Sequence, residues 1–146
     1  MTDFISRRKR SALMARIKSC NTAPEFVVRS FLHRHGYRYR IHVRTLPGRP
    51  DMALRKYRTA IFVNGCFWHG HRGCTRASVP KSNSLFWRKK ITGNAARDRR
   101  TATALRRLGW TVLTVWQCQL RKSHVDATLA RLLTRIEGGT AARKRH

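Results

Sequence analysis

Acidic residues are scarce in this sequence. Its 146 residues include only 6 Asp and Glu, against 33 Lys and Arg, and the formal net charge is +27. An imbalance of this size indicates a polyanionic partner, and we expect that partner to be nucleic acid. Any site for a hard metal ion must take its side-chain carboxylates from a short set: Asp3, Glu25, Asp51, Asp98, Asp126 and Glu137.

Long apolar runs are also missing. The longest compact stretch, Ala60-Ile61-Phe62-Val63, has the length of a strand and falls far short of the roughly 20 residues of a membrane span. The first ten residues are basic, but no apolar segment follows them, so no secretory signal is predicted. We therefore expect a cytoplasmic, nucleoid-associated protein without a membrane partner. With 41% hydrophobic residues, the chain can form the core of a single domain.

Cysteine is limited to four residues, and in a reducing compartment these are expected to bind metal or remain free thiols. The pattern Cys66-x4-His71-x2-Cys74 places three potential metal ligands within nine positions, and Cys118 lies just past the strand predicted at 110–116. A tetrahedral Cys3His set is a common structural zinc site, in which protein fills every position. The alternative is a group of buried free thiols beside a surface histidine. Cys20 is interpreted as a packing residue.

Turn residues and hydrophobic spacing predict a mixed α/β domain. Thr22 and Glu25 have capping-box spacing at a helix start, and Gly36 and Gly109 end helices. The predicted order is a basic helix to about residue 18, a second helix ending before Gly36, strands at 37–43, 51–54 and 59–63, a helix at 84–108, a strand at 110–116 and a helix from Ser123 to 137.

Asp51 follows a Gly/Pro turn at the start of a predicted strand, which is one half of a common nuclease arrangement for Mg2+. The usual second half, an acidic residue on the next strand, is missing from 59–65. By spacing alone, a turn-capping role for Asp51 is the more frequent explanation. Glu25 has a similar alternative as the capping partner of Thr22, and Asp98 as a helix-surface ion pair.

His69 and several aromatic residues lie in basic surroundings. An imidazole at His69 can act as a general base toward water, although most single histidines are structural. Phe67-Trp68 and Phe86-Trp87 are suited to insertion between base steps, and the alternative is that they belong to the core.

Five segments are distinctive in their residues and spacing. Together they resemble the very short patch repair endonucleases, over about residues 6–120. The segments are Asn21-Thr22-x-Pro24-Glu25, Leu46-Pro47-Gly48-Arg49-Pro50-Asp51, Ile61-Phe62-Val63-Asn64-Gly65-Cys66-Phe67-Trp68-His69-Gly70-His71, Phe86-Trp87-x3-Ile91-x2-Asn94-x2-Arg97-Asp98, and Leu108-Gly109-Trp110-x-Val112-Leu113-x2-Trp116-x-Cys118.

The resemblance implies a restriction-endonuclease-like fold of the PD-(D/E)XK type, with a mixed central sheet flanked by helices. It implies a strand-specific, Mg2+-dependent nick in duplex DNA, 5′ of the mispaired thymine in T·G mismatches left by deaminated 5-methylcytosine. The expected organisation is a DNA-clasping arm at 1–20, an endonuclease domain at 21–137 with a zinc loop at 64–80, and a flexible basic tail at 138–146. A monomer is expected, with functional links to a cytosine-5 DNA methyltransferase and a repair polymerase.

The resemblance also implies roles for single residues. Asp51 and the backbone carbonyl of Val63 would bind Mg2+, of which two ions are expected. His69 would be the general base, Glu25 would hold metal-coordinated water, and Asp98 would orient the set. The zinc ligands would be Cys66, His71, Cys74 and Cys118, the wedge would be Phe67, Trp68 and Trp87, and the arm would contact DNA through Arg7, Arg8, Arg10, Arg16 and Lys18.

One position departs from the family pattern. Residue 64 is a histidine in the best-known members and Asn64 here; an amide can donate a hydrogen bond to phosphate but cannot carry a proton at neutral pH. Val63 replaces a polar residue, which matters little if only its carbonyl is used. Two other functions stay open: a zinc-containing DNA-binding module without catalysis, and a nuclease of the same fold without mismatch preference.

Overall fold

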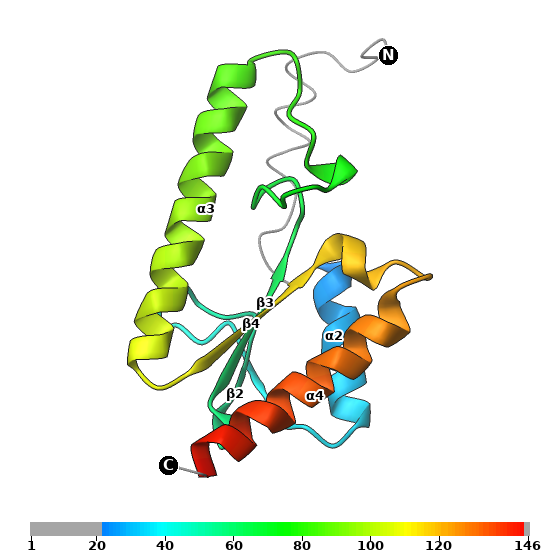
Figure 1. Ribbon diagram of the computed structural model, residues 1–146, viewed down its shortest axis with the longest axis vertical. Helices are drawn as coiled ribbons and strands as arrows, with labels where there is room; N and C mark the ends of the chain where they lie inside the picture. Colours follow the sequence, from blue (N-terminus) through cyan, green and yellow to red (C-terminus); the bar gives the residue numbers. More distant parts are fainter. Residues whose placement is uncertain (1–21, 145–146) are drawn as a thin grey trace.

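The fold is built around a mixed four-stranded sheet with the strand order β1-β2-β3-β4 (Figure 1). β2 pairs antiparallel with β1 and with β3, whereas β3 and β4 are parallel and are joined through the long helix α3. The computed structural model describes residues 22–144, with side chains up to 139. Its elements are α2 (Ala23–Arg34), β1 (Arg40–Ile41), β2 (Met52–Leu54), β3 (Thr59–Asn64), α3 (Ser84–Arg107), β4 (Thr111–Trp116) and α4 (Val125–Lys144), with short 3-10 turns at Arg55–Tyr57, Thr75–Ala77 and Gln117–Leu120.

The two faces of the sheet have different partners. In Figure 1, α2 and α4 lie on one side of the strands and α3 lies on the other. Met52, Ile61 and Leu113 point to the first side and form the main core with residues of α2 and α4, such as Leu32 and Ile136. Because strand side chains alternate between faces, their neighbours point toward α3. The α3 side is therefore the face on which a cavity can form between sheet and helix.

The mixed α/β class and the order of the described elements are as predicted, but two element boundaries are wrong. The strand predicted at 37–43 is only β1, because His42 adopts a left-handed backbone with φ 47° directly after Ile41. The last helix does not end at 137. Gly138 and Gly139 continue α4, and a Cβ at Gly139 would lie only 3.2 Å from Thr111 Oγ1, so glycine permits the close approach of helix and strand.

Several predictions fall outside the described residues. These are the N-terminal helix, the packing role of Cys20, and the DNA contacts of Arg7, Arg8, Arg10, Arg16 and Lys18. Within the described part of the chain, no helix combines the length and the hydrophobicity that a membrane span requires.

Gly48 is expected to be essential for stability. Its φ is +73°, and a Cβ added there would overlap the side chain of Thr101 on α3. We expect Gly48→Ala to lower the free energy of unfolding by about 2–4 kcal/mol, from the left-handed backbone plus the overlap. Gly36→Ala is the matched control, because Gly36 has φ +81° and open space around its Cβ position. Denaturant unfolding of both variants measures the two free energies of unfolding. Equal losses in Gly48→Ala and Gly36→Ala would show that overlap with Thr101 adds nothing, and would contradict the prediction.

Candidate active site and metal cluster

A cavity of about 430 Å³ lies between the sheet and α3. Its walls come from the segments just before β2 and just after β1, from β3 and β4, from the loop after β3, and from the middle of α3. Asp51, Val63, Asn64, His69 and Asp98 all line it. Candidate residues from four separate segments of the chain therefore share one cavity.

Asp51 is fixed by the neighbouring strand. The backbone N–H of Val63 donates a hydrogen bond to Asp51 Oδ2 at 2.7 Å, since β2 and β3 are paired in antiparallel register immediately beside it. Burial raises the pKa of Asp51 from its usual value of 3.8 to about 7; the Val63 bond opposes this, and the charge of Glu25 adds to it. A cation placed beside this carboxyl group would favour its ionised form.

The raised pKa predicts how stability depends on pH. Without added Mg2+, the folded chain binds the Asp51 proton more tightly than the unfolded chain, so the free energy of unfolding should fall as pH rises from about 4 to about 7. Asp51→Asn should remove this part of the slope. Chemical denaturation of both proteins at several pH values measures it. If their slopes agree over that range, the burial of Asp51 is not the cause.

Glu25 is buried in the first turn of α2, with 1% of its surface exposed. The expected capping box is not observed: Thr22 is the N-cap but makes no side-chain capping bond, and its hydroxyl donates only a long hydrogen bond, of 3.5 Å, to Glu25 Oε1. Instead, Glu25 Oε2 accepts a hydrogen bond from Arg29 at 2.8 Å and lies 3.2 Å from His42 Nε2. Ligand atoms of Glu25, His42 and Asp51 all lie within 4.8 Å of one another.

His42 and Arg29 are the site residues that sequence reasoning missed. Both contact Glu25, and Arg29 Nη2 also lies 3.3 Å from His42 Nε2. Within the sequence, His42 looked like one more residue of an alternating strand. Its only structural signal, a positive φ, cannot be read from the residue type, because histidine adopts that region only rarely.

His69 is paired with Asp98. His69 Nδ1 lies 2.6 Å from Asp98 Oδ2, across the gap between the loop after β3 and the middle of α3. Their side chains are 30% and 41% exposed, so the pair stays accessible from the cavity. A carboxylate at Nδ1 orients the imidazole and leaves Nε2 to accept a proton. The alternative for Asp98, a surface ion pair within its own helix, is not what the geometry shows.

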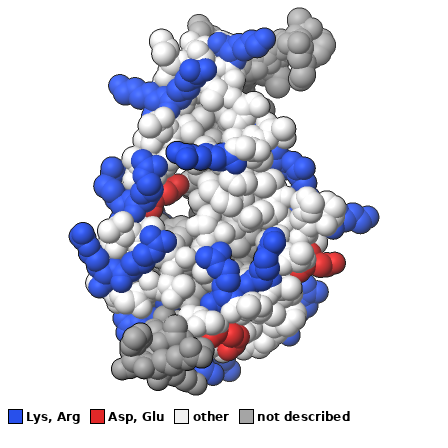
Figure 2. Space-filling model, in the orientation of Figure 1, with Lys and Arg blue, Asp and Glu red and all other residues white. Residues whose placement is uncertain are grey.

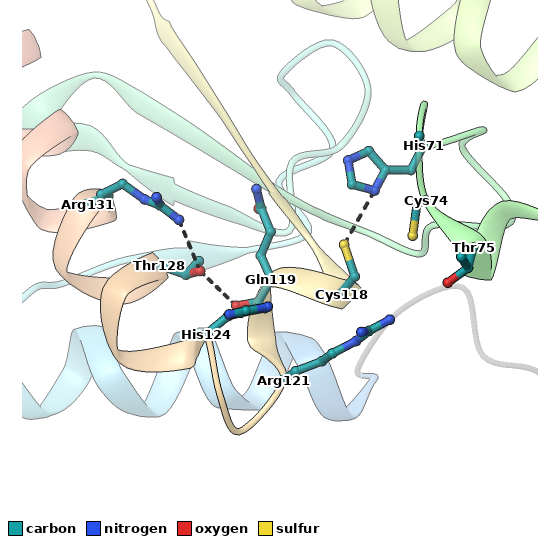
Figure 3. Close-up of a pocket in the computed structure, with 10 residues that line it drawn as sticks. His71, Cys74, Thr75, Cys118, Gln119, Arg121, His124, Thr128 and Arg131 are labelled. Atoms are coloured by element: carbon teal, nitrogen blue, oxygen red, sulfur yellow. Dashed lines mark hydrogen bonds between the residues drawn. The ribbon is translucent and has the colours of Figure 1, made fainter.

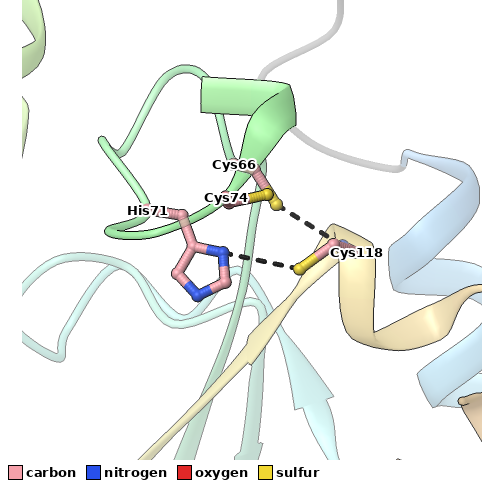
Figure 4. A group of neighbouring side chains, drawn as sticks. All are labelled: Cys66, His71, Cys74 and Cys118. Carbon is pink, nitrogen blue, oxygen red and sulfur yellow. Dashed lines mark hydrogen bonds between the residues drawn. The ribbon is translucent and has the colours of Figure 1, made fainter. Parts of the chain in front are cut away.

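A second cluster lies at the opposite side of the loop after β3. Figure 4 shows Cys66, His71 and Cys74 from this loop facing Cys118, which follows β4. Their ligand atoms all lie within 4.8 Å of one another, and His71 Nδ1 is 3.4 Å from Cys118 Sγ. His71 also stacks on Trp116 with ring centroids 4.1 Å apart, which fixes its ring plane. Three thiols and an imidazole at this separation fit a tetrahedral ion such as zinc.

A basic cavity of about 450 Å³ adjoins this cluster (Figure 3). Cys74 and Cys118 border it on one side, and Arg121, His124 and Arg131 on the other. None of the described residues that line it is acidic. This cavity is suited to anions, and it extends the positively charged surface beyond the cavity of Asp51.

The predicted aromatic residues are brought together. The ring centroid of Phe67 lies 5.1 Å from that of Trp68 and 5.5 Å from that of Trp87. The ring centroids of the two tryptophans are 5.8 Å apart, and all three pairs are in edge-to-face contact. Phe86, 57% exposed, extends the cluster, and Lys90 Nζ lies 5.6 Å from the Trp68 ring. None of these aromatic rings belongs to the main core among the described residues. Large rings beside basic groups are typical of surfaces that contact bases.

Positive charge surrounds these features. Figure 2 shows Lys and Arg side chains spread over the visible face and only small areas of Asp and Glu. A surface of this kind is suited to phosphate groups, whose contacts give affinity without sequence preference.

Comparison with known proteins gives consistent matches. The family model of DNA mismatch endonuclease Vsr matches residues 2–76. The chain is 49% identical to the type II nicking enzyme V.XorIIP of Xanthomonas oryzae pv. oryzae over 132 residues, which cover 90% of this chain and 95% of that relative. It is 44% identical to the type II nicking enzyme V.NmeAIP of Neisseria meningitidis, over 94% and 98% of the two chains. It is 43% identical to DNA mismatch endonuclease Vsr of Escherichia coli, over 83% and 77%.

Proposed function

The chain belongs to the DNA mismatch endonuclease Vsr family and is a nuclease, and from this premise we propose that it nicks one strand of duplex DNA 5′ of the mispaired thymine in T·G mismatches, with Mg2+. The observation that carries the proposal is the shared cavity of Asp51, Val63, His69 and Asp98. The mixed sheet with helices on both faces supports a restriction-endonuclease-like fold.

Asp51 and the backbone carbonyl of Val63 are the proposed ligands of Mg2+. The hydrogen bond from Val63 N–H supports this, because it places the Val63 backbone against the Asp51 carboxylate. When bound, Mg2+ would supply charge stabilisation for the phosphodiester, and two ions are proposed. Glu25 is close enough to Asp51 to position water beside it.

His69 is the proposed general base, with Asp98 as the residue that orients it. The 2.6 Å contact at Nδ1 supports this division of roles, since Nε2 then takes the proton of the attacking water. Asn64 is buried at the end of β3 and lines the same cavity. As an amide it can donate a hydrogen bond to phosphate but cannot share the acid–base work.

Loss of the base should slow nicking strongly. We expect His69→Ala to reduce the nicking rate by about 10²–10⁴-fold, the usual contribution of a general base. Asp98→Asn should lose less, because the imidazole remains but is held less firmly. Single-turnover nicking of a T·G duplex measures both, with DNA affinity as the control. A wild-type rate in His69→Ala would contradict the assignment.

The remaining features are assigned to DNA contact and to the fold. Phe67, Trp68 and Trp87 are the proposed wedge beside the mismatch, which their clustering supports. The basic arm at 1–20 is proposed to clasp the duplex. Zinc on Cys66, His71, Cys74 and Cys118 is proposed to be structural, because protein supplies all four ligands. The basic segment at 138–146 is proposed to form a tail beyond the endonuclease domain at 21–137, and its residues as far as Lys144 continue α4.

We propose that the protein acts as a monomer, on chromosomal DNA, in the cytoplasm. A single asymmetric mismatch needs only one copy of the chain. Functional links to two other enzymes are also proposed. A cytosine-5 DNA methyltransferase would produce the mismatch-prone sites, and a repair polymerase would fill the nicked strand.

Mismatch preference separates this function from its alternatives. Nicking rates should be compared on duplexes of one sequence that differ only in one pair: T·G, the matched T·A and C·G pairs, and other mismatches. We expect cleavage of T·G far above the others. Equal cleavage of all duplexes would indicate a nuclease without mismatch preference. Binding without cleavage of any duplex would indicate a non-catalytic module.

A further inference from the structure

Two basic side chains contact the carboxylate of Glu25 at Oε2, and they come from different elements. Arg29 donates to Oε2 at 2.8 Å, but it lies one turn further along the same helix, so this bond fixes the carboxylate only relative to α2. His42 approaches the same oxygen at 3.2 Å and comes from the end of β1. β1 is paired with β2, which leads directly from Asp51, so His42 connects Glu25 to the sheet that carries Asp51.

The backbone at His42 is arranged to make this contact. Its φ of 47° lies in the left-handed region, which costs a non-glycine residue about 1–2 kcal/mol. The turn ends β1 and lets the ring line the cavity that also holds Asp51. Unfavourable backbone conformations persist where surrounding structure enforces them, and they concentrate at functional sites.

The charges around His42 favour an indirect role over direct metal binding. Arg29 Nη2 lies 3.3 Å from His42 Nε2, the same nitrogen that faces Glu25. A guanidinium so close disfavours a second cation on this nitrogen. The same arrangement is suited to holding the buried carboxylate of Glu25 in place beside the carboxylate of Asp51.

We propose that His42 is a positioning residue for nicking, which holds the Glu25 carboxylate in register with Asp51 across the junction of α2 and the sheet. This proposal rests on the proposed role of Glu25 in catalysis. In this role the ring acts through Glu25 rather than by contact with DNA or the reacting phosphate. Its loss removes the contact between Glu25 and the end of β1, so that the separation of the two carboxylates is held less firmly.

Three substitutions at residue 42 test the role. Glycine suits the observed φ and removes the ring, asparagine also tolerates this φ but is too short, and glutamine places an amide nitrogen as many bonds from Cα as Nε2. We expect His42→Gly and His42→Asn to remain folded, with unchanged DNA affinity. Their nicking rate should fall by about 10–100-fold, and the Mg2+ concentration for half-maximal rate should rise. His42→Gln should recover most of the rate.

Combination with Glu25→Gln separates the possible failures. If His42 acts through Glu25, then His42→Gly should cause little further loss in the Glu25→Gln background. Wild-type nicking by His42→Gly, no recovery in His42→Gln, or full additivity of the two losses would each overturn the proposal for His42 while leaving the proposed function intact. Wild-type nicking by Glu25→Gln alone would instead contradict the catalytic role of Glu25 on which the proposal rests.

Discussion

Asp51→Asn is expected to lower the nicking rate by about 10³-fold or more while DNA affinity stays near that of the wild type. Asp51 is the proposed carboxylate ligand of Mg2+, and an amide in its place cannot neutralise the ion. Metal stabilisation of the transition state contributes several kcal/mol, and each 1.36 kcal/mol corresponds to about tenfold in rate. Affinity should persist because the change removes a negative charge from a surface that binds a polyanion.

The control for this variant is Asp126→Asn. It makes the same chemical change at an exposed residue in the first turn of α4, away from the cavity. Its nicking rate should match the wild type, with only a small loss of helix stability. Single-turnover rates and equilibrium binding on a T·G duplex should be measured for both variants. Substantial nicking by Asp51→Asn would rule out the proposed metal ligand.

Cys66→Ser is expected to remove one zinc ion per chain and most of the stability of the fold. Cys66 is fully buried, and its cluster joins the loop after β3 to the segment after β4. Structural zinc sites contribute about 10–16 kcal/mol of binding free energy in small peptides, which is comparable to the whole stability of a typical domain, about 5–15 kcal/mol. Loss of one ligand therefore threatens folding as a whole. Metal content and thermal unfolding measure the effect.

His124→Gln is the control for the cluster. His124 borders the neighbouring basic cavity but is not one of the four clustered residues, so its replacement should leave the zinc content unchanged. A wild-type protein that is folded and free of zinc would contradict the structural role. So would a Cys66→Ser protein that unfolds at the wild-type temperature.

How much of the site could be predicted from the sequence depends on how far apart in the chain the interacting residues lie. Cys66, His71 and Cys74 are local and carry their own spacing signal, and they do gather with Cys118 in the structure. The pairing of His69 with Asp98 joins positions 29 residues apart. Here the motif resemblance supplied both residues, but only tertiary structure could show that they touch.

Other features depended on backbone and packing and could not be read from residue types. Capping-box spacing gave Glu25 a local alternative, and burial against Arg29 and His42 decided against it. Alternation predicted a strand through His42, whereas a left-handed residue ends it. Two consecutive glycines predicted a helix end, yet packing of Gly139 against Thr111 is compatible with a continuous α4.

The central claim is a Mg2+-dependent nick at one position of one strand, and strand-resolved mapping tests it most directly. A T·G duplex is labelled on each strand in turn, incubated with the protein with and without Mg2+, and resolved under denaturing conditions. Mg2+ should be omitted rather than chelated, because a chelator would also draw on the Cys/His cluster. We predict a single cut 5′ of the mispaired thymine, in that strand only, and only with Mg2+. Cuts in both strands, cuts elsewhere, or full cleavage without Mg2+ would contradict the claim.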